Sequence, residues 1–175
     1  LMPGLRQAWP EGAFYRFDAI LGADALHYRG PEFGWWRIPD QYALARLDQV
    51  ERDARPRFVF FPTISSHAPF RPTPPYQPDW ARLTSATPFG AEAQAALGVA
   101  PEWHALGPAY ADTIAYAHEW LAGYLERHAA SDVTLVILGD HQPPAAVSGQ
   151  GADWTVPVHV VTRRDAVLDP LRQHG

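Results

Sequence analysis

Continuous runs of apolar residues recur along the chain, and several are rich in β-branched and aromatic side chains. Such runs are typical of strands that are buried on both faces of a sheet. The predicted strands cover 57–65, 133–139 and 154–163, and a short one covers 14–18. The run at 133–139 is the clearest of them, because it ends at an adjacent aspartate and histidine.

Other segments place their apolar residues three and four positions apart, which is typical of amphipathic helices. A helix is predicted over 41–54, where Asp40 caps its start and Pro56 ends it. Further helices are predicted over 90–98 and 108–130, and the second has the strongest helical period of the chain. The alternation of strands and helices predicts an α/β fold with a mostly parallel sheet flanked by helices.

The segment 67–80 follows neither pattern and carries five prolines. Because proline fixes φ and lacks a backbone donor, this segment is predicted to be neither a helix nor a central strand. Loops of this length inside compact domains are usually functional or disordered. Its prolines and three aromatic residues favour an ordered loop or a lid.

The composition is that of a globular protein, with 175 residues, 47% hydrophobic and 19% charged. A chain of this size is expected to form a single domain, here over 1–175. No apolar run approaches the roughly 18 residues that a membrane-spanning helix needs, so the chain itself is expected to be soluble. The first residues have neither a basic start nor an apolar segment, and no secretion signal is predicted within them.

The charge of the chain and its lack of cysteine limit the possible partners and the possible chemistry of a site. The formal net charge is −5, and all 14 basic residues are scattered arginines, since the chain has no lysine. This distribution argues against nucleic acid as a partner. The absence of cysteine excludes disulfides, thiolate metal sites and cysteine nucleophiles. Any metal ligands within the chain are therefore oxygen atoms and imidazoles.

Asp140 and His141 are the most informative pair, because they directly follow the apolar run 133–139. In open α/β sheets, ligands bind outside the carboxyl ends of the strands, where side chains converge. A carboxylate and an imidazole both bind divalent metals, and the prolines at 143 and 144 favour the turn that lets neighbours share one ion. We predict a metal site here; the alternative is a turn-capping aspartate beside a surface histidine.

Three further residues are candidates for contact with an anionic ester. His67 follows the predicted strand 57–65 and is suited to donate a proton to a substrate oxygen. Arg71 is suited to bidentate pairing with an anion, and His159 to substrate contact or to support of the metal site. The alternatives are a hydrogen-bonded loop histidine, a solvated arginine and a histidine satisfied inside the core.

Four segments together carry a resemblance to a known family. They are FVFFPTISSHAPF, YADTIAYAHEWLAGYLERH, TLVILGDHQPP and TVPVHVV. In order and spacing they resemble the C-terminal half of the sulfatase-like branch of the alkaline phosphatase superfamily, in particular its membrane-anchored lipoteichoic acid synthases and phosphoethanolamine transferases. The resemblance covers residues 14–165, and the Asp-His pair is its most specific element.

The resemblance implies the C-terminal part of an alkaline-phosphatase-like sandwich that hydrolyses or transfers phosphoric or sulfuric esters with a divalent metal: Mn, Zn, Mg or Ca. Asp140 and His141 fall on the family's metal ligands, and His67 falls on its anion-contacting histidine. Gln142 stands where the family usually has glycine, and His118 replaces an acidic residue often found in the long helix. These departures leave the substrate open.

In that family the nucleophile and a further acidic metal ligand belong to an N-terminal half. The resemblance therefore implies that the N-terminal remainder of the same polypeptide completes the site, and that the isolated chain is a weak or inactive catalyst. It also implies an extracytoplasmic domain that is anchored to the membrane through that remainder. The expected substrate is an anionic phosphate or sulfate ester with a lipid or glycan headgroup.

Two other functions stay open from the sequence. A Ser-His-Asp hydrolase would use Ser65 or Ser66 with a histidine and Asp140, but the chain lacks the G-x-S-x-G turn typical of such enzymes. A non-catalytic sulfatase-like module would bind glycan, lipid headgroup or protein through its aromatic, proline-rich face. The residues available to such a face include Glu32, Trp35, Trp36, Asp40 and Tyr76.

Overall fold

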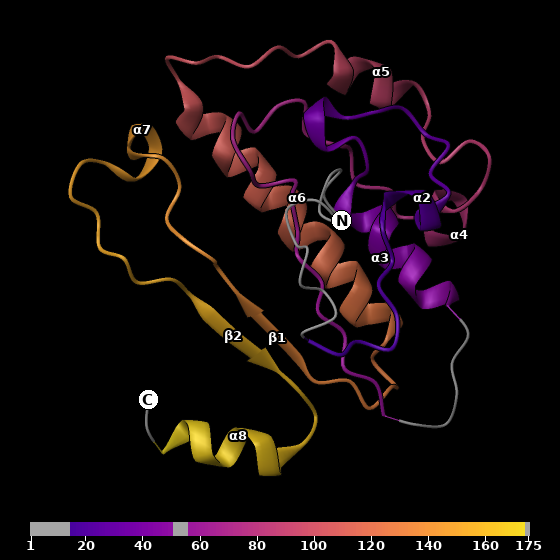
Figure 1. Ribbon diagram of the computed structural model, residues 1–175. Helices are drawn as coiled ribbons and strands as arrows, with labels where there is room; N and C mark the ends of the chain where they lie inside the picture. Colours follow the sequence, from indigo (N-terminus) through magenta and orange to yellow (C-terminus); the bar gives the residue numbers. More distant parts are fainter. Residues whose placement is uncertain (1–14, 51–55, 174–175) are drawn as a thin grey trace. The chain divides into compact units, whose positions relative to one another are not determined.

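A computed structural model describes residues 15–50 and 56–173 of the chain. The chain divides into two compact units, unit 1 (Leu1–Trp120) and unit 2 (Leu121–Gly175). Figure 1 follows the elements of both units along the chain. The single domain predicted over 1–175 stays a prediction.

Unit 1 consists of short helices joined by long loops and of most of one long helix. Its elements are α2 (Ala23–Leu26), the 3₁₀ turn η1 (Gly34–Trp36), α3 (Asp40–Gln49), α4 (Trp80–Leu83), α5 (Ala91–Leu97) and α6 (Leu106–Arg127), which continues into unit 2. The helices predicted over 90–98 and 108–130 are confirmed as α5 and α6. The helix predicted over 41–54 is confirmed as far as Gln49, and 51–55 lie outside the described residues.

The N-terminal half of α3 lies inside unit 1. Its first six residues, from Asp40 to Ala45, are all buried. A carboxylate in the first turn is favourable there, because the free backbone amides give this end of a helix a partial positive charge. The helix ends where Val50 adopts an extended backbone conformation. α3 is therefore held by burial at its start and is exposed toward its end.

Aromatic side chains form much of the core of unit 1. Phe33, Trp36 and Phe70 are almost fully buried. The rings of Phe33 and Phe89 meet edge to face with centroids 5.6 Å apart, and those of Phe70 and Tyr110 do so at 5.2 Å. Edge-to-face pairs add about 0.5–1.5 kcal/mol each to the burial of their area. This packing positions the loop that follows His67 against α6.

The strand predicted over 57–65 is wrong. None of its residues belongs to a strand, and residue 65 already lies in a turn. Phe58 is 81% exposed and Phe60 is 54% exposed, so the run is buried only at its end, at Ile64 and Ser65. An apolar run favours a strand only where a neighbouring strand supplies hydrogen-bond partners, and the described residues provide none for this segment. The short strand near 14–18 is also wrong where it is described, since 15–18 form turns and bends.

Unit 2 contains the end of α6, the strands β1 (Leu135–Leu138) and β2 (Val158–Val161), and the helices α7 (Ala145–Ser148) and α8 (Asp165–Arg172). Figure 1 shows β1 and β2 running side by side in opposite directions, with Leu135 opposite Val161 and Leu138 opposite Val158. The strands predicted over 133–139 and 154–163 are thus confirmed in shorter form.

The predicted fold class, an α/β fold with a mostly parallel sheet flanked by helices, is wrong. The described residues contain one sheet of two strands, and the pair is antiparallel. A parallel pair needs a crossover connection, usually a helix that spans the sheet. Between β1 and β2 the chain forms only the four-residue α7 and a turn with Gly149 and Gly151 at positive φ. The long helix α6 precedes β1 and does not join the two strands.

One face of this sheet is apolar and exposed. Val136, Leu138 and Val158 lie on the same face by their pairing and are 57–62% exposed. The flanking helices that were predicted are therefore not found on this face in the described part of unit 2. At the other end of the ribbon, Arg164 forms an ion pair with Asp132 and fixes the turn into α8.

None of the helices in 15–50 and 56–173 combines the length and the apolar character that crossing a bilayer requires.

Candidate functional site

The candidate residues fall in both units. His67 and Arg71 belong to unit 1, whereas Asp140, His141 and His159 belong to unit 2. The predicted convergence of His67 with the Asp140–His141 pair stays a prediction.

His67 lies in a tight turn at the start of the proline-rich loop. Its amide donates to the carbonyl of Ile64 at 2.9 Å, and its own carbonyl accepts from the amide of Phe70 at 3.1 Å. The ring Nδ1 donates to the carbonyl of Ala68 at 2.8 Å, which leaves Nε2 as the nitrogen available to a ligand. The exposed ring also meets Trp35 edge to face, with centroids 5.0 Å apart. This is a fixed imidazole that presents one defined nitrogen.

The turn before His67 is held by a buried carboxylate. Asp40 accepts from the amide of Ile64 at 3.0 and 3.1 Å and from the amide of Ser65 at 2.8 Å. Its side chain is inaccessible to solvent, and burial raises the pKa of Asp40 above the ordinary carboxyl value even though these donors act in the opposite direction. Asp40 thereby fixes the backbone that leads into His67.

From the sequence, Asp40 is predicted only to cap a helix and to belong to a binding face, and this role is not predicted. The residue lies in the first turn of α3, next to the N-cap Pro39, but its carboxylate bonds to a segment 24 and 25 positions away. The available signal was an acidic residue at the start of a predicted helix. That signal alone does not identify the partner, because a distant backbone contact leaves no spacing pattern.

The hydroxyl of Tyr116 on α6 belongs to the same buried region. Burial raises its pKa well above the ordinary tyrosine value, and the nearby charge of Asp40 raises it further. Tyr116 on α6 therefore lies near Asp40 on α3, although no hydrogen bond joins the two side chains in the described residues.

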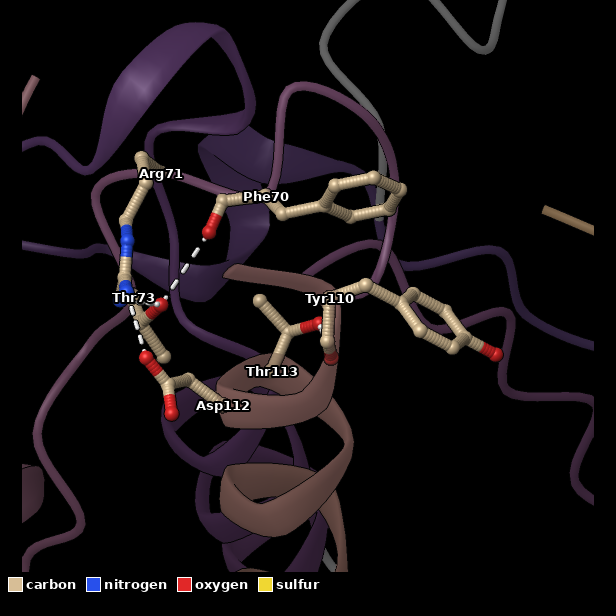
Figure 2. A network of polar contacts seen from close by, with 6 residues as sticks. All are labelled: Phe70, Arg71, Thr73, Tyr110, Asp112 and Thr113. Carbon is tan, nitrogen blue, oxygen red and sulfur yellow. Dashed lines mark hydrogen bonds and ion pairs between the residues drawn. The ribbon is translucent and has the colours of Figure 1, made fainter. Parts of the chain in front are cut away.

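Arg71 forms an ion pair with Asp112 on α6 and donates to the hydroxyl of Thr73 at 3.1 Å. Figure 2 shows the guanidinium extended toward both groups, with the Thr73 hydroxyl also donating to the carbonyl of Phe70 at 3.1 Å. The Arg71 side chain is mostly buried and its charge is balanced by Asp112, so it is not a solvated loop arginine. It ties the proline-rich loop to the start of α6.

Two further contacts order the same loop, as predicted. Gln41 on α3 and Gln77 exchange hydrogen bonds, since the Gln41 amide donates to the Gln77 carbonyl at 2.7 Å and the Gln77 backbone amide donates back at 3.0 Å. Phe70 adopts a positive φ of 65°, which a non-glycine residue holds only where its surroundings impose it. The buried Phe70 ring supplies that constraint. The loop is thus anchored at both ends.

Asp140 and His141 lie just after β1. The amide of His141 donates to Asp140 Oδ1 at 2.9 Å, and His141 Nδ1 donates to the carbonyl of Gln142 at 2.7 Å. The remaining nitrogen, Nε2, faces Asp140 Oδ2 at 3.6 Å. Both side chains are exposed, 61% for His141 and 90% for Asp140. As in His67, a backbone carbonyl fixes the ring and leaves Nε2 free.

This pair fits two ligands of one metal ion. Zinc-type bonds of about 2.0–2.1 Å, at angles near 110–120°, place their two donor atoms about 3.3–3.6 Å apart. A hydrogen bond from Nδ1 to a carbonyl is the usual support for a ligating imidazole, because it turns the lone pair of Nε2 toward the ion. Within 15–50 and 56–173, no three acidic or histidine side chains gather closely enough to form a complete metal site. The metal site predicted at Asp140 and His141 therefore stays a prediction.

His159 lies on β2 opposite Ile137 and is exposed. Its interpretation as a histidine satisfied within the core does not fit this exposure. In the rival serine-hydrolase arrangement, the histidine donates from Nδ1 to the aspartate. His67 Nδ1 donates instead to the carbonyl of Ala68, and Ser65 is buried.

The comparisons add no relative to this picture. Comparison of the chain with protein-family models, with curated proteins and with solved structures finds no match. Any family assignment consequently rests on the sequence motifs and on the site geometry alone.

Proposed function

We propose that this chain supplies the metal-ligating and anion-contacting part of a metal-dependent phosphoric or sulfuric ester hydrolase or transferase. The observation that carries the proposal is the geometry of Asp140 and His141. Their oxygen and nitrogen atoms face each other at a separation that suits a shared ion, and the ring is already fixed by Gln142. The motif resemblance supports the same assignment.

Asp140 and His141 would hold the ion, which is Mn, Zn, Mg or Ca by the nature of their donors. When bound, a divalent ion polarises the ester oxygen and favours attack by a hydroxyl or water nucleophile. The nucleophile and the remaining ligands belong, in this proposal, to the N-terminal remainder of the same polypeptide. The isolated chain is then a poor catalyst, although it retains part of the metal affinity.

His67 would contact the anionic group of the substrate through Nε2. Since Nδ1 donates to Ala68, Nε2 accepts a hydrogen bond in the neutral ring and donates one in the protonated ring. Protonated His67 can therefore stabilise a non-bridging oxygen or protonate a leaving group. Asp40 contributes by fixing the turn. Arg71, which is already paired with Asp112, contributes by anchoring the loop rather than by meeting the anion.

The proposed substrate is an anionic ester with a lipid or glycan headgroup. Trp35 supports this choice, because it is 46% exposed and lies against the His67 ring. An exposed indole beside a phosphate- or sulfate-binding imidazole suits stacking on a sugar or on a headgroup. Such substrates and the family resemblance favour an extracytoplasmic, membrane-anchored setting for the whole polypeptide.

Metal binding by the purified chain tests the proposal directly. Equilibrium dialysis against Mn²⁺ and Zn²⁺ should give one bound ion that is lost, or weakened at least about tenfold, in Asp140→Ala and in His141→Ala. His104→Ala, which removes an exposed histidine from unit 1, is the matched control and should bind as the original chain does. Equal binding by all four proteins would reject the site.

A second candidate function is a non-catalytic module that binds glycan or headgroup through Trp35 and the ordered loop. The exposed indole of Trp35 in η1, next to a loop that is anchored at both ends, favours it, because a rigid aromatic surface suits recognition without chemistry. Under this alternative the chain binds glycan or lipid headgroup with no metal requirement. Dialysis with and without a chelator separates the two functions.

A further inference from the structure

Unit 1 contains a cavity that shares no residue with the candidate site. It has a volume of about 190 Å³ and lies between the end of α2, the face of α3 and the loop after α4. The residues lining it are His27, Arg29, Tyr42, Arg46, Thr84, Ser85 and Ala86. Two arginines, one histidine and three hydroxyl groups thus border one small hollow, and no carboxylate does.

The guanidinium of Arg46 is held in place by neutral groups. Its Nε donates to the carbonyl of Leu26 at 3.1 Å, and Nη1 donates to the side-chain oxygen of Gln49. Gln49 in turn donates to the Thr84 hydroxyl at 2.7 Å, which connects α3 to the loop on the far side of the cavity. The positive group is therefore oriented before any ligand arrives, and Nη2 remains available to one.

The positive charges at the cavity are not balanced within the described residues. Among 15–50 and 56–173, the structure pairs neither Arg29 nor Arg46 with a carboxylate. Both lie near Tyr42, because their charges favour the ionised form of its hydroxyl, against the larger effect of burial, which raises its pKa. Two neighbouring guanidiniums repel each other, and an anion between them would relieve that repulsion.

The loop after α4 adds a free donor. The Ser85 hydroxyl oxygen accepts from the amide of Thr87 at 3.2 Å, so its proton remains available to a ligand. Tyr42 donates its own proton to the carbonyl of Leu26 at 2.8 Å and therefore contributes its ring as a wall. The donors that face the cavity are thus two guanidiniums and a hydroxyl, with His27 as a further donor when protonated.

We propose that this cavity binds a tetrahedral oxyanion, a phosphate or sulfate group, either free or at the end of a larger molecule. Guanidinium groups match the oxygens of such anions bidentately, and a hydroxyl donor completes the contact. The volume is below the roughly 300–1,000 Å³ of pockets that enclose drug-sized ligands, so one anionic group fits and a whole substrate does not. This inference is independent of the proposed function.

Titration of the ¹⁵N-labelled chain with inorganic phosphate, and separately with methyl phosphate, tests the proposal. At constant ionic strength, the amide signals of Ser85 and Ala86 should shift and saturate with phosphate, whereas chloride at the same ionic strength should leave them unchanged. Saturation by phosphate but not by methyl phosphate assigns the site to the free ion; saturation by both assigns it to a phosphate end group. Linear shifts that chloride reproduces would overturn the proposal.

Arg29→Ala is the decisive variant, because Arg29 forms no hydrogen bond or ion pair that would hold the described fold together. It should weaken phosphate binding by about tenfold, the effect expected for one charge-assisted contact. Arg57→Ala removes another exposed arginine of unit 1 outside the cavity and is the matched control. Equal affinity in Arg29→Ala and in the unmodified chain, or equal losses in both variants, would show that the cavity is not the site.

Discussion

At the scale of single residues, the least replaceable group in unit 1 is the carboxylate of Asp40. It satisfies two backbone amides in a region that water does not reach, and an unsatisfied buried donor costs about 1–3 kcal/mol. The same contact determines where His67 lies. A residue that the sequence presents as a helix start thus contributes both to stability and to the candidate site.

Asp40→Ala is expected to lower the free energy of unfolding by about 3 kcal/mol, because it leaves the amides of Ile64 and Ser65 without acceptors. Urea denaturation monitored by tryptophan fluorescence measures the loss. Asp18→Ala, at an exposed aspartate of the same unit, should change the value by less than about 0.5 kcal/mol. Similar midpoints for the two variants would contradict this role of Asp40.

The pKa of Asp40 also predicts a dependence of stability on pH. Because burial raises this pKa in the folded chain, the folded state holds a proton that the unfolded state has already lost. The raised pKa therefore contributes stability that is fully present below the ordinary aspartate pKa of about 4 and is lost as the pH rises through the raised value. The free energy of unfolding of Asp40→Asn is the reference for this contribution. Denaturation series of both proteins from acid to neutral pH measure it. If the difference in the free energy of unfolding between the two proteins increases with pH in this window, the predicted direction of the pH dependence is contradicted.

At the scale of elements, the proline-rich loop is ordered by contacts with two helices. Arg71 connects it to α6, and Gln77 connects it to α3. The ion pair is partly exposed on the Asp112 side, so its contribution to overall stability is small. Its contribution to local order is larger, because a loop without strand or helix bonds depends on side-chain anchors.

Arg71→Ala should therefore increase amide hydrogen exchange in 67–76 while lowering the global free energy of unfolding by no more than about 1 kcal/mol. Exchange followed by mass spectrometry measures the local effect. Arg172→Ala removes an exposed arginine from the short ion pair on α8 and should leave the loop unchanged. If exchange in the loop is the same in all three proteins, the loop is ordered without the Arg71–Asp112 pair.

Sequence patterns predicted the helices better than the sheet. The helical period of 108–130 identifies α6 because the signal lies within the element itself. The run at 57–65 has the composition of a strand, yet pairing depends on a partner elsewhere, and no pattern within the run reports it. The site follows the same rule. The position of Asp140 and His141 just after a strand is a local feature and could be predicted, whereas the contact of Asp40 with Ser65 is long-range and could not.

At the scale of the whole molecule, burial is distributed unevenly. All of the buried hydrophobic side chains within 15–50 and 56–173 occur at or before Trp120. In the described part of unit 2 only Gly123 is buried, and an isolated two-stranded ribbon is at best marginally stable in water. The strands of unit 2 consequently derive little stability from their own packing.

We expect the amides of β1 and β2 to exchange through openings with a free energy of no more than about 2 kcal/mol. The amides of the first turns of α3 and of the centre of α6 should require openings with a higher free energy. Native-state hydrogen exchange by NMR measures both groups in one experiment.

Val136→Thr and Leu138→Thr should also reduce self-association in sedimentation velocity, because they interrupt the exposed apolar face. Val99→Thr, at an exposed position in unit 1, is the control.

The placement of α3 has a further consequence. Its first residue, Asp40, accepts hydrogen bonds from the turn that precedes His67. Six residues later, Arg46 lines the cavity together with Ser85. A helix of ten residues behaves as a stiff rod, so a small tilt at one end is transmitted to the other. An anion bound at Arg46 would therefore change the orientation of the His67 imidazole without contacting it.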